Sequence, residues 1–183
     1  MGRPTAFKQL LTKEISDYES LSQHQFCPTK GEIQTWFDNI NTHVFHGRIY
    51  ATFGRVEIRR RHGVWAEYSG WIDPRRNAKS RCKILQELPA FRKRPRILER
   101  KVTICGLLSI TDNFPSKKIF IEVLAHEMVH LYQFLYATPP FSYRSVSHGK
   151  TFHAWKPTFE KHGLRLRVTL HHSKQKATKK KVT

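Results

Sequence analysis

The sequence contains few cysteines, and their arrangement restricts both its compartment and its chemistry. Cys27, Cys82 and Cys105 are the three cysteines, and no two of them form a Cys-x-x-Cys pair. An odd number without such a pair argues against a disulfide framework and against a cysteine-based zinc site. This pattern favours a reducing compartment, so we expect an intracellular protein.

Long apolar runs are also missing. No stretch near the N-terminus has the composition of a signal peptide, and none reaches the roughly 20 apolar residues that a membrane-spanning helix needs. We therefore expect no association with a membrane. A chain of 183 residues is long enough for one domain with a real core, and we expect it to be a monomer.

Acidic residues are scarce, which leaves a large positive charge. Lys and Arg number 33 against 14 Asp and Glu, so the formal net charge is +19. Such a charge predicts a polyanionic partner, most simply nucleic acid. The charge is concentrated in residues 74–101, with 11 basic against two acidic residues, and in residues 173–183, with five lysines and no acid.

These two segments are the predicted DNA-binding regions. We interpret residues 173–183 as a disordered tail that binds polyanions weakly, whereas spaced arginines in 74–101 suit contacts to phosphates. The alternative for 74–101 is a solvated basic loop. The residues predicted to contact DNA, without sequence preference, are Arg75, Arg76, Arg81, Arg92, Lys93, Arg94, Arg96, Lys179, Lys180 and Lys181.

The most informative stretch is Phe120–Tyr136, which is strongly apolar with helical spacing and has Ser116 as a plausible N-cap. Residues 126–130 of this stretch read His-Glu-Met-Val-His. Because a helix has 3.6 residues per turn, His126 and His130 face the same side and can reach one zinc ion. Glu127 then lies beside the metal and can move a proton from a zinc-bound water to a leaving amine. The motif predicts a zinc peptidase.

A catalytic zinc takes three protein ligands and keeps one open position, so a third ligand must come from another segment. The metzincin spacing would put a histidine at position 136, which is a tyrosine. His148 is the first candidate and His153 the second, while Glu160 is the only glutamate after the motif.

The pairing of His-Glu-x-x-His with His148-Gly149-Lys150-Thr151-Phe152 resembles the SprT-like metallopeptidases, the family that includes Spartan. Trp36–Asn39, Phe45–Arg48 and Val56–Ile58 resemble that family's opening helix, turn and first strand. The sequence departs from the family in its long basic segment 74–101 and in lacking the cysteine-rich zinc ribbon that some members carry.

The resemblance implies an α+β, zincin-like metalloprotease domain over residues 29–172, with 74–101 as an insertion. It also implies that His126, His130 and His148 hold Zn²⁺, with Glu127 as catalytic base. The implied substrates are proteins attached to or associated with DNA. By the same resemblance, the strand predicted at Val102–Ile110 is the candidate for pairing with substrate, and Gly106 within it could let a peptide come close.

The remaining patterns predict helices packed on a small, mainly antiparallel sheet. Residues 1–28 would form an arm with an amphipathic helix at Thr5–Leu21, and a capping box at Thr29 and Glu32 would start a helix ending near His46. The period-2 segments predict strands at Arg55–Arg60, Val64–Ile72, Val102–Ile110 and Leu164–Leu170. Pro157 should interrupt the helical pattern that follows His148.

Two other functions fit parts of this pattern. A nucleic-acid-binding or packaging protein with a structural zinc would explain the charge without needing Glu127 as a base. A processing peptidase with one partner would use the same site with a narrow choice of substrate.

Overall fold

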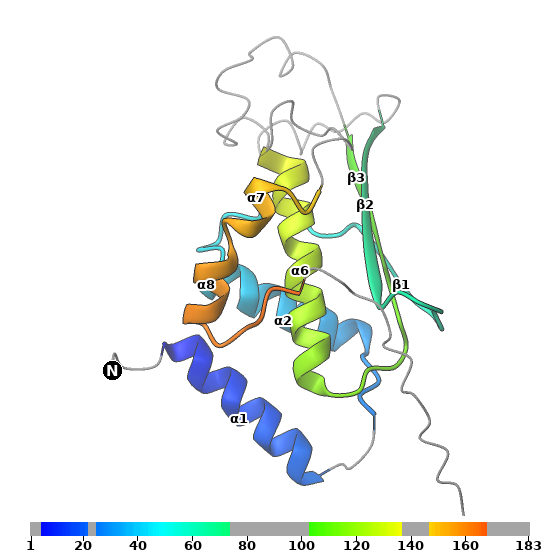
Figure 1. The fold of residues 1–183 in the computed structure, drawn as a ribbon. Helices are drawn as coiled ribbons and strands as arrows, with labels where there is room; N and C mark the ends of the chain where they lie inside the picture. The colour runs from blue at the N-terminus through cyan, green and yellow to red at the C-terminus, as the bar shows by residue number, and fades with distance from the viewer. Residues whose placement is uncertain (1–4, 22–24, 74–102, 137–146, 168–183) are drawn as a thin grey trace, which may run out of the picture.

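The computed structural model describes residues 5–21, 25–73, 103–136 and 147–167. Along this part of the chain the elements are α1 (Ala6–Leu21), α2 (Lys30–His43), β1 (Arg55–Ile58), β2 (Ala66–Asp73), β3 (Thr103–Ile110), α6 (Lys117–Tyr136), α7 (Lys150–His153) and α8 (Lys156–Lys161) (Figure 1). The predicted α+β class is confirmed. Of the helices in these ranges, none combines the length and the apolar character that crossing a membrane requires. The basic segment 74–101 and the tail 173–183 lie outside the described residues.

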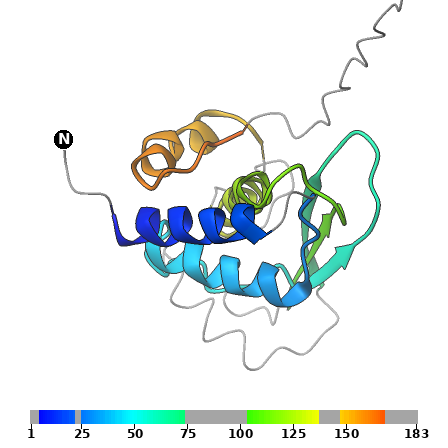
Figure 2. The same cartoon turned by 90° about the horizontal axis from the view of Figure 1, so that it is seen from below.

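Helix α6 is the centre of the fold. The sheet lies on one side of it and α7 and α8 on the other, while α2 crosses behind it and α1 runs past its lower end (Figures 1 and 2). Every residue from Phe120 to Val129 is buried. A helix surrounded in this way is mostly apolar on all sides, which explains why this stretch is so hydrophobic, and its few buried polar side chains need partners.

Local signals set the helix boundaries. The predicted capping box is present, since Thr29 Oγ1 accepts the Glu32 N–H at 3.2 Å and the Glu32 carboxylate accepts the Thr29 N–H at 2.9 Å. Ser116 caps α6 by accepting the Ile119 N–H at 3.2 Å. Pro157 lies in the first turn of α8, where its missing N–H costs nothing, so the helical pattern breaks into α7 and α8.

The sheet has the order β1-β3-β2 and is mixed. The longer pairing, β2 with β3, is antiparallel as predicted, whereas β1 pairs with β3 in parallel. β3 lies between the other two strands, so its residues 107–110 pair with a strand on both sides, whereas residues 103–106 pair with β2 alone. For residues 107–110 the expectation that this strand pairs with substrate is therefore wrong, and for residues 103–106 it stays a prediction. The edge strands of the described sheet are β1 and β2.

The predicted final strand also differs from the structure. Residues 164–167 form no strand, and residues 168–170 lie outside the described part. Leu164 and Leu166 are buried in alternation, as a strand would require, but the backbone bonds to side chains of α6. The Arg165 N–H donates to Glu122 at 3.2 Å, and the Arg167 carbonyl lies 2.5 Å from His126 Nδ1.

Two glycines allow the chain before β1 to cross β3 at close range. A Cβ atom on Gly54 would lie 2.6 Å from the Gly106 carbonyl oxygen, and one on Gly106 would lie 2.5 Å from the Phe53 carbonyl oxygen. Both distances are far inside van der Waals contact. Gly106 is therefore approached by the protein's own backbone, not by a peptide.

We predict that Gly54→Ala destabilises the protein more than Gly47→Ala does. Both glycines have positive φ, 79° and 68°, which costs a side chain about 1–2 kcal/mol. Only at Gly54 does the added methyl group also meet backbone, which adds about 1–3 kcal/mol, since nothing lies within 4 Å of a Cβ at Gly47. Urea unfolding measures both losses, and equal losses would contradict the close crossing.

Candidate metal centre

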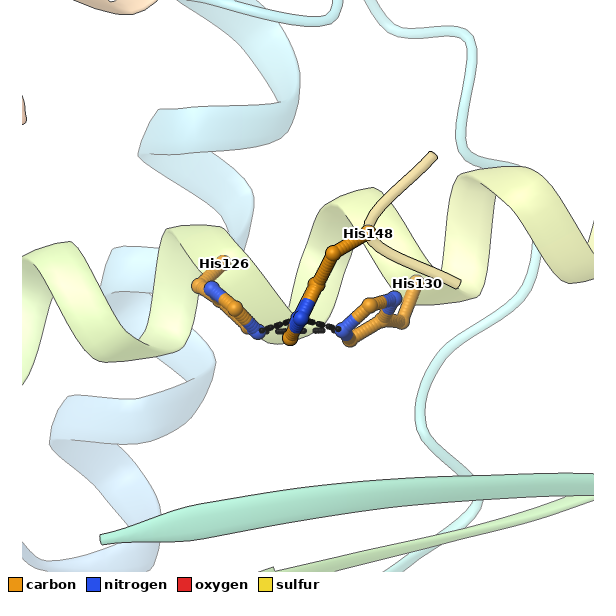
Figure 3. Close-up of side chains that lie close together, drawn as sticks. All are labelled: His126, His130 and His148. Atoms are coloured by element: carbon orange, nitrogen blue, oxygen red, sulfur yellow. Dashed lines mark hydrogen bonds between the residues drawn. The ribbon is translucent and has the colours of Figure 1, made fainter. Parts of the chain in front are cut away.

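Three histidines converge beside α6. His126 and His130 project from successive turns of the helix, and His148 reaches them from the separate segment before α7 (Figure 3). The Nε2 atom of His130 lies 3.0 Å from that of His126 and 3.1 Å from that of His148, and the remaining pair is 3.1 Å apart. The predicted two-plus-one arrangement of imidazoles is thus present in the geometry.

The position of the proton on the His126 ring favours a cation between the three Nε2 atoms. The Nδ1 atom of His126 lies 2.5 Å from the Arg167 carbonyl oxygen, which can only accept a hydrogen bond. Nδ1 therefore carries the proton, and Nε2 points its lone pair at the other two rings. Zinc bound to nitrogen at about 2.0–2.1 Å with tetrahedral angles separates its ligands by about 3.3 Å, close to the spacing found here. The three histidines can hold a metal ion.

The other candidates for third ligand lie elsewhere. Among the described residues, the group of side chains that can share one ion is His126, His130 and His148. His153 is exposed and turns its ring edge-on to Phe152, and Glu160 is exposed with its carboxylate 3.9 Å from Lys156 Nζ. The geometry favours the first of the three candidates.

Burial keeps the imidazoles neutral. It lowers the pKa of His126 to about 3, with a further contribution from His130, and it lowers the pKa of His130 to about 4. Partial burial of its ring also lowers the pKa of His148, with a further contribution from His153. A neutral imidazole is the form that binds a metal, so all three rings are ready to do so at neutral pH.

Glu127 lies one residue after His126 and is held by the sheet. Its Oε2 atom accepts the backbone N–H of Tyr68 on β2 at 2.8 Å, and its side chain is buried. Burial raises the pKa of Glu127 to about 8, an effect that the Tyr68 N–H partly offsets. A cation bound nearby would favour the ionised form, because opposite charges lower a carboxyl pKa.

Several residues that support the site were not predicted. Glu122, four residues before His126, is 1% exposed and binds Arg167 Nε at 2.7 Å, and through Arg167 it holds the carbonyl that orients His126. Gln133 binds His130 Nδ1 at 3.0 Å. The available signal was an acid and an amide within a strongly apolar helix, which indicates that both need polar partners. The sequence does not identify those partners, because they lie far away along the chain.

Phe152 packs against all three imidazoles. Its ring centroid lies 4.8 Å from that of His126, 5.1 Å from that of His130 and 4.6 Å from that of His148, and the side chain is fully buried. The phenylalanine of the His-Gly-x-x-Phe pattern therefore restricts the rings from one side.

The residues predicted to contact DNA lie outside the described residues. This applies to Arg75, Arg76, Arg81, Arg92, Lys93, Arg94, Arg96, Lys179, Lys180 and Lys181. Their assignment stays a prediction.

One of three comparisons with known proteins finds a match, and that match contains this centre. No curated protein matches the chain, and no solved structure does either. The family model of the SprT-like family matches residues 33–172, a range that contains the sheet, α6 and all three histidines. The chain belongs to the SprT-like family.

Proposed function

We propose that this protein is a zinc-dependent endopeptidase with a zincin-like catalytic domain, and that it cuts proteins bound or crosslinked to DNA. The observation that carries the proposal is the meeting of three imidazole Nε2 atoms within 3.0–3.1 Å, next to a buried glutamate on the same helix. Membership of the SprT-like family supports a metallopeptidase.

In this proposal His126, His130 and His148 hold the ion. When bound, zinc supplies a Lewis acid that polarises a carbonyl and lowers the pKa of a coordinated water to about 7. Glu127 uses its second oxygen, Oε1, because Oε2 is held by the Tyr68 N–H. Oε1 takes the proton of the attacking water and then gives it to the leaving nitrogen of the substrate.

Strand β2 would present the substrate. It lies at an edge of the described sheet, and its Tyr68 N–H contacts the proposed catalytic base. An extended peptide that adds to this edge would have its backbone beside Glu127. Main-chain pairing carries little sequence preference, which fits an enzyme with varied protein substrates.

DNA would confine the activity. The net charge of +19 favours binding to nucleic acid, and binding to the same DNA would bring enzyme and substrate close together. A protease without strong sequence preference then acts mainly on proteins that share its DNA.

A packaging protein with a structural zinc is the rival function. Structural zinc sites are usually closed by four protein ligands. In the described ranges, three side chains converge at the centre, and His148 is exposed to solvent. This open arrangement favours the enzyme.

We expect Glu127→Gln to reduce proteolysis by about 10²–10⁴-fold, because the amide cannot accept the proton of the attacking water. The assay follows cleavage of a DNA-binding protein, or of the enzyme itself, with zinc and DNA present. Glu160→Gln is the matched control at an exposed carboxylate and should cut like the parent. Equal activity of parent and Glu127→Gln would contradict the proposal.

We expect His148→Ala to weaken zinc binding by more than about 100-fold, since loss of a ligand should cost at least as much as loss of a ligand's supporting hydrogen bond. His153→Ala should leave zinc affinity unchanged. Competition with a chromophoric chelator measures both. The reverse order would assign the third ligand to His153.

Replacing Arg92, Lys93, Arg94 and Arg96 with glutamine should weaken DNA binding and lower the slope of log K against log salt by up to about 3–4. Removing the same charge from Lys8, Lys13, Lys156 and Lys161, exposed on α1 and α8, is the control. Fluorescence anisotropy across a salt series measures the slopes. An equal effect of the two sets would argue against a DNA site in residues 74–101.

A further inference from the structure

Gln133 connects the two segments that carry the histidines. It lies on α6 three residues after His130 and is 3% exposed. Its Oε1 atom lies 3.0 Å from His130 Nδ1. Its Nε2 atom donates to the Ser147 carbonyl oxygen and to Thr151 Oγ1, each at 2.8 Å. One amide thus uses both of its N–H bonds and its oxygen.

The chemistry of these partners fixes the proton on His130. The Ser147 carbonyl can only accept, so the Gln133 atom facing it is the NH₂ group and the other end is the carbonyl oxygen. That oxygen also only accepts, so Nδ1 of His130 must donate to it. The neutral ring then has its lone pair on Nε2, the atom that faces His126 and His148.

The same side chain fixes the backbone around His148. Ser147 precedes this histidine directly, and Thr151 follows it by three residues, so the two N–H bonds hold the chain on both sides of the ligand. Helix α7 has four residues and no side-chain cap, and His148 itself is exposed. Phe152 packs this segment against the histidine rings of α6, and Gln133 adds hydrogen bonds between α6 and the segment.

We propose that Gln133 is a positioning residue that sets the Nε2 tautomer of His130 and the place of His148 together, so that the site is assembled before metal arrives. The proposal rests on the metal centre of the proposed function. Gln133 touches neither the ion nor the substrate in this arrangement. Its contribution is to avoid the cost of arranging two ligands at the moment of binding.

Gln133→Met tests the proposal, because methionine has a similar size and shape without the hydrogen bonds. Zinc affinity of the full chain, measured by competition with a chromophoric chelator, should fall about 10- to 100-fold. Gln34→Met is the matched control, since Gln34 is an exposed helical glutamine that binds Asp38 Oδ1 at 3.0 Å. It should keep the affinity of the parent.

Two further variants separate the two parts of the role. Gln133→Glu keeps an acceptor for His130 Nδ1 but cannot donate from an ionised carboxylate to Ser147 or Thr151. Nitrogen NMR should still report the Nδ1–H tautomer of His130, while amide exchange of residues 147–153 in the metal-free protein should speed up. Thr151→Val removes one contact at an exposed residue, so folding is not at risk, and it should lower zinc affinity by less than Gln133→Met does.

The outcomes separate this inference from the proposed function. If the parent binds no zinc, the metal centre itself is wrong. If the parent binds zinc and both Gln133→Met and Thr151→Val bind it equally well, Gln133 is not a positioning residue. A lower melting temperature of Gln133→Met with unchanged zinc affinity would likewise assign Gln133 a structural role only, and would overturn the inference.

Discussion

The cost of burying polar groups in α6 determines how the rest of the chain is arranged around it. Burying an amide or hydroxyl without a hydrogen-bond partner costs about 2–7 kcal/mol of folding free energy. Glu122, His126, Glu127 and Gln133 are all buried on this helix. Each finds its partner in another segment: residues 165–167 for the first two, β2 for Glu127, and residues 147–151 for Gln133. The packing of both sides of the fold against α6 therefore depends on satisfying these groups.

These partnerships also divide the chemistry of the site between the two sides of the helix. The sheet side orients the carboxylate, through Tyr68 on β2. The side formed by residues 147–167 orients the imidazoles, through Arg167, Ser147 and Phe152. Hydrogen bonds to the far nitrogen of an imidazole fix its tautomer and raise its basicity as a ligand. The site is thus organised by the same contacts that hold the layers together.

Sequence patterns predicted the features that depend on residues close together in the chain. They failed for features that depend on contacts between residues far apart in the chain. The spacing of His126 and His130, the capping box at Thr29 and the break at Pro157 are local, and the structure has all of them. Strand periodicity predicted four strands, three of which form the sheet, but it did not predict their order, because alternation indicates which face is buried and not which strand is the neighbour. Residues 164–167 illustrate the limit: their burial alternates as in a strand, yet Glu122 and His126 occupy the hydrogen-bonding groups that a partner strand would need. His148 was the first candidate for the third ligand, and the resemblance implied it as well, whereas Gln133 was missed because its partners follow it by 14 and 18 residues.

The first 32 residues lie outside the range that matches the family, yet Phe7, Leu11 and Phe26, among the described ones, belong to the same hydrophobic core. Phe7 is 1% exposed and packs edge-on against Trp36, and Phe26 forms a β-bridge with Phe114 through two 2.8 Å hydrogen bonds. Thr29, which caps α2, also precedes the matched range. A chain cut back to the family boundary would lose that cap and would expose the apolar surface that α1 covers, which favours aggregation. We therefore expect the stable folded unit of this protein to be longer than the range that matches the family.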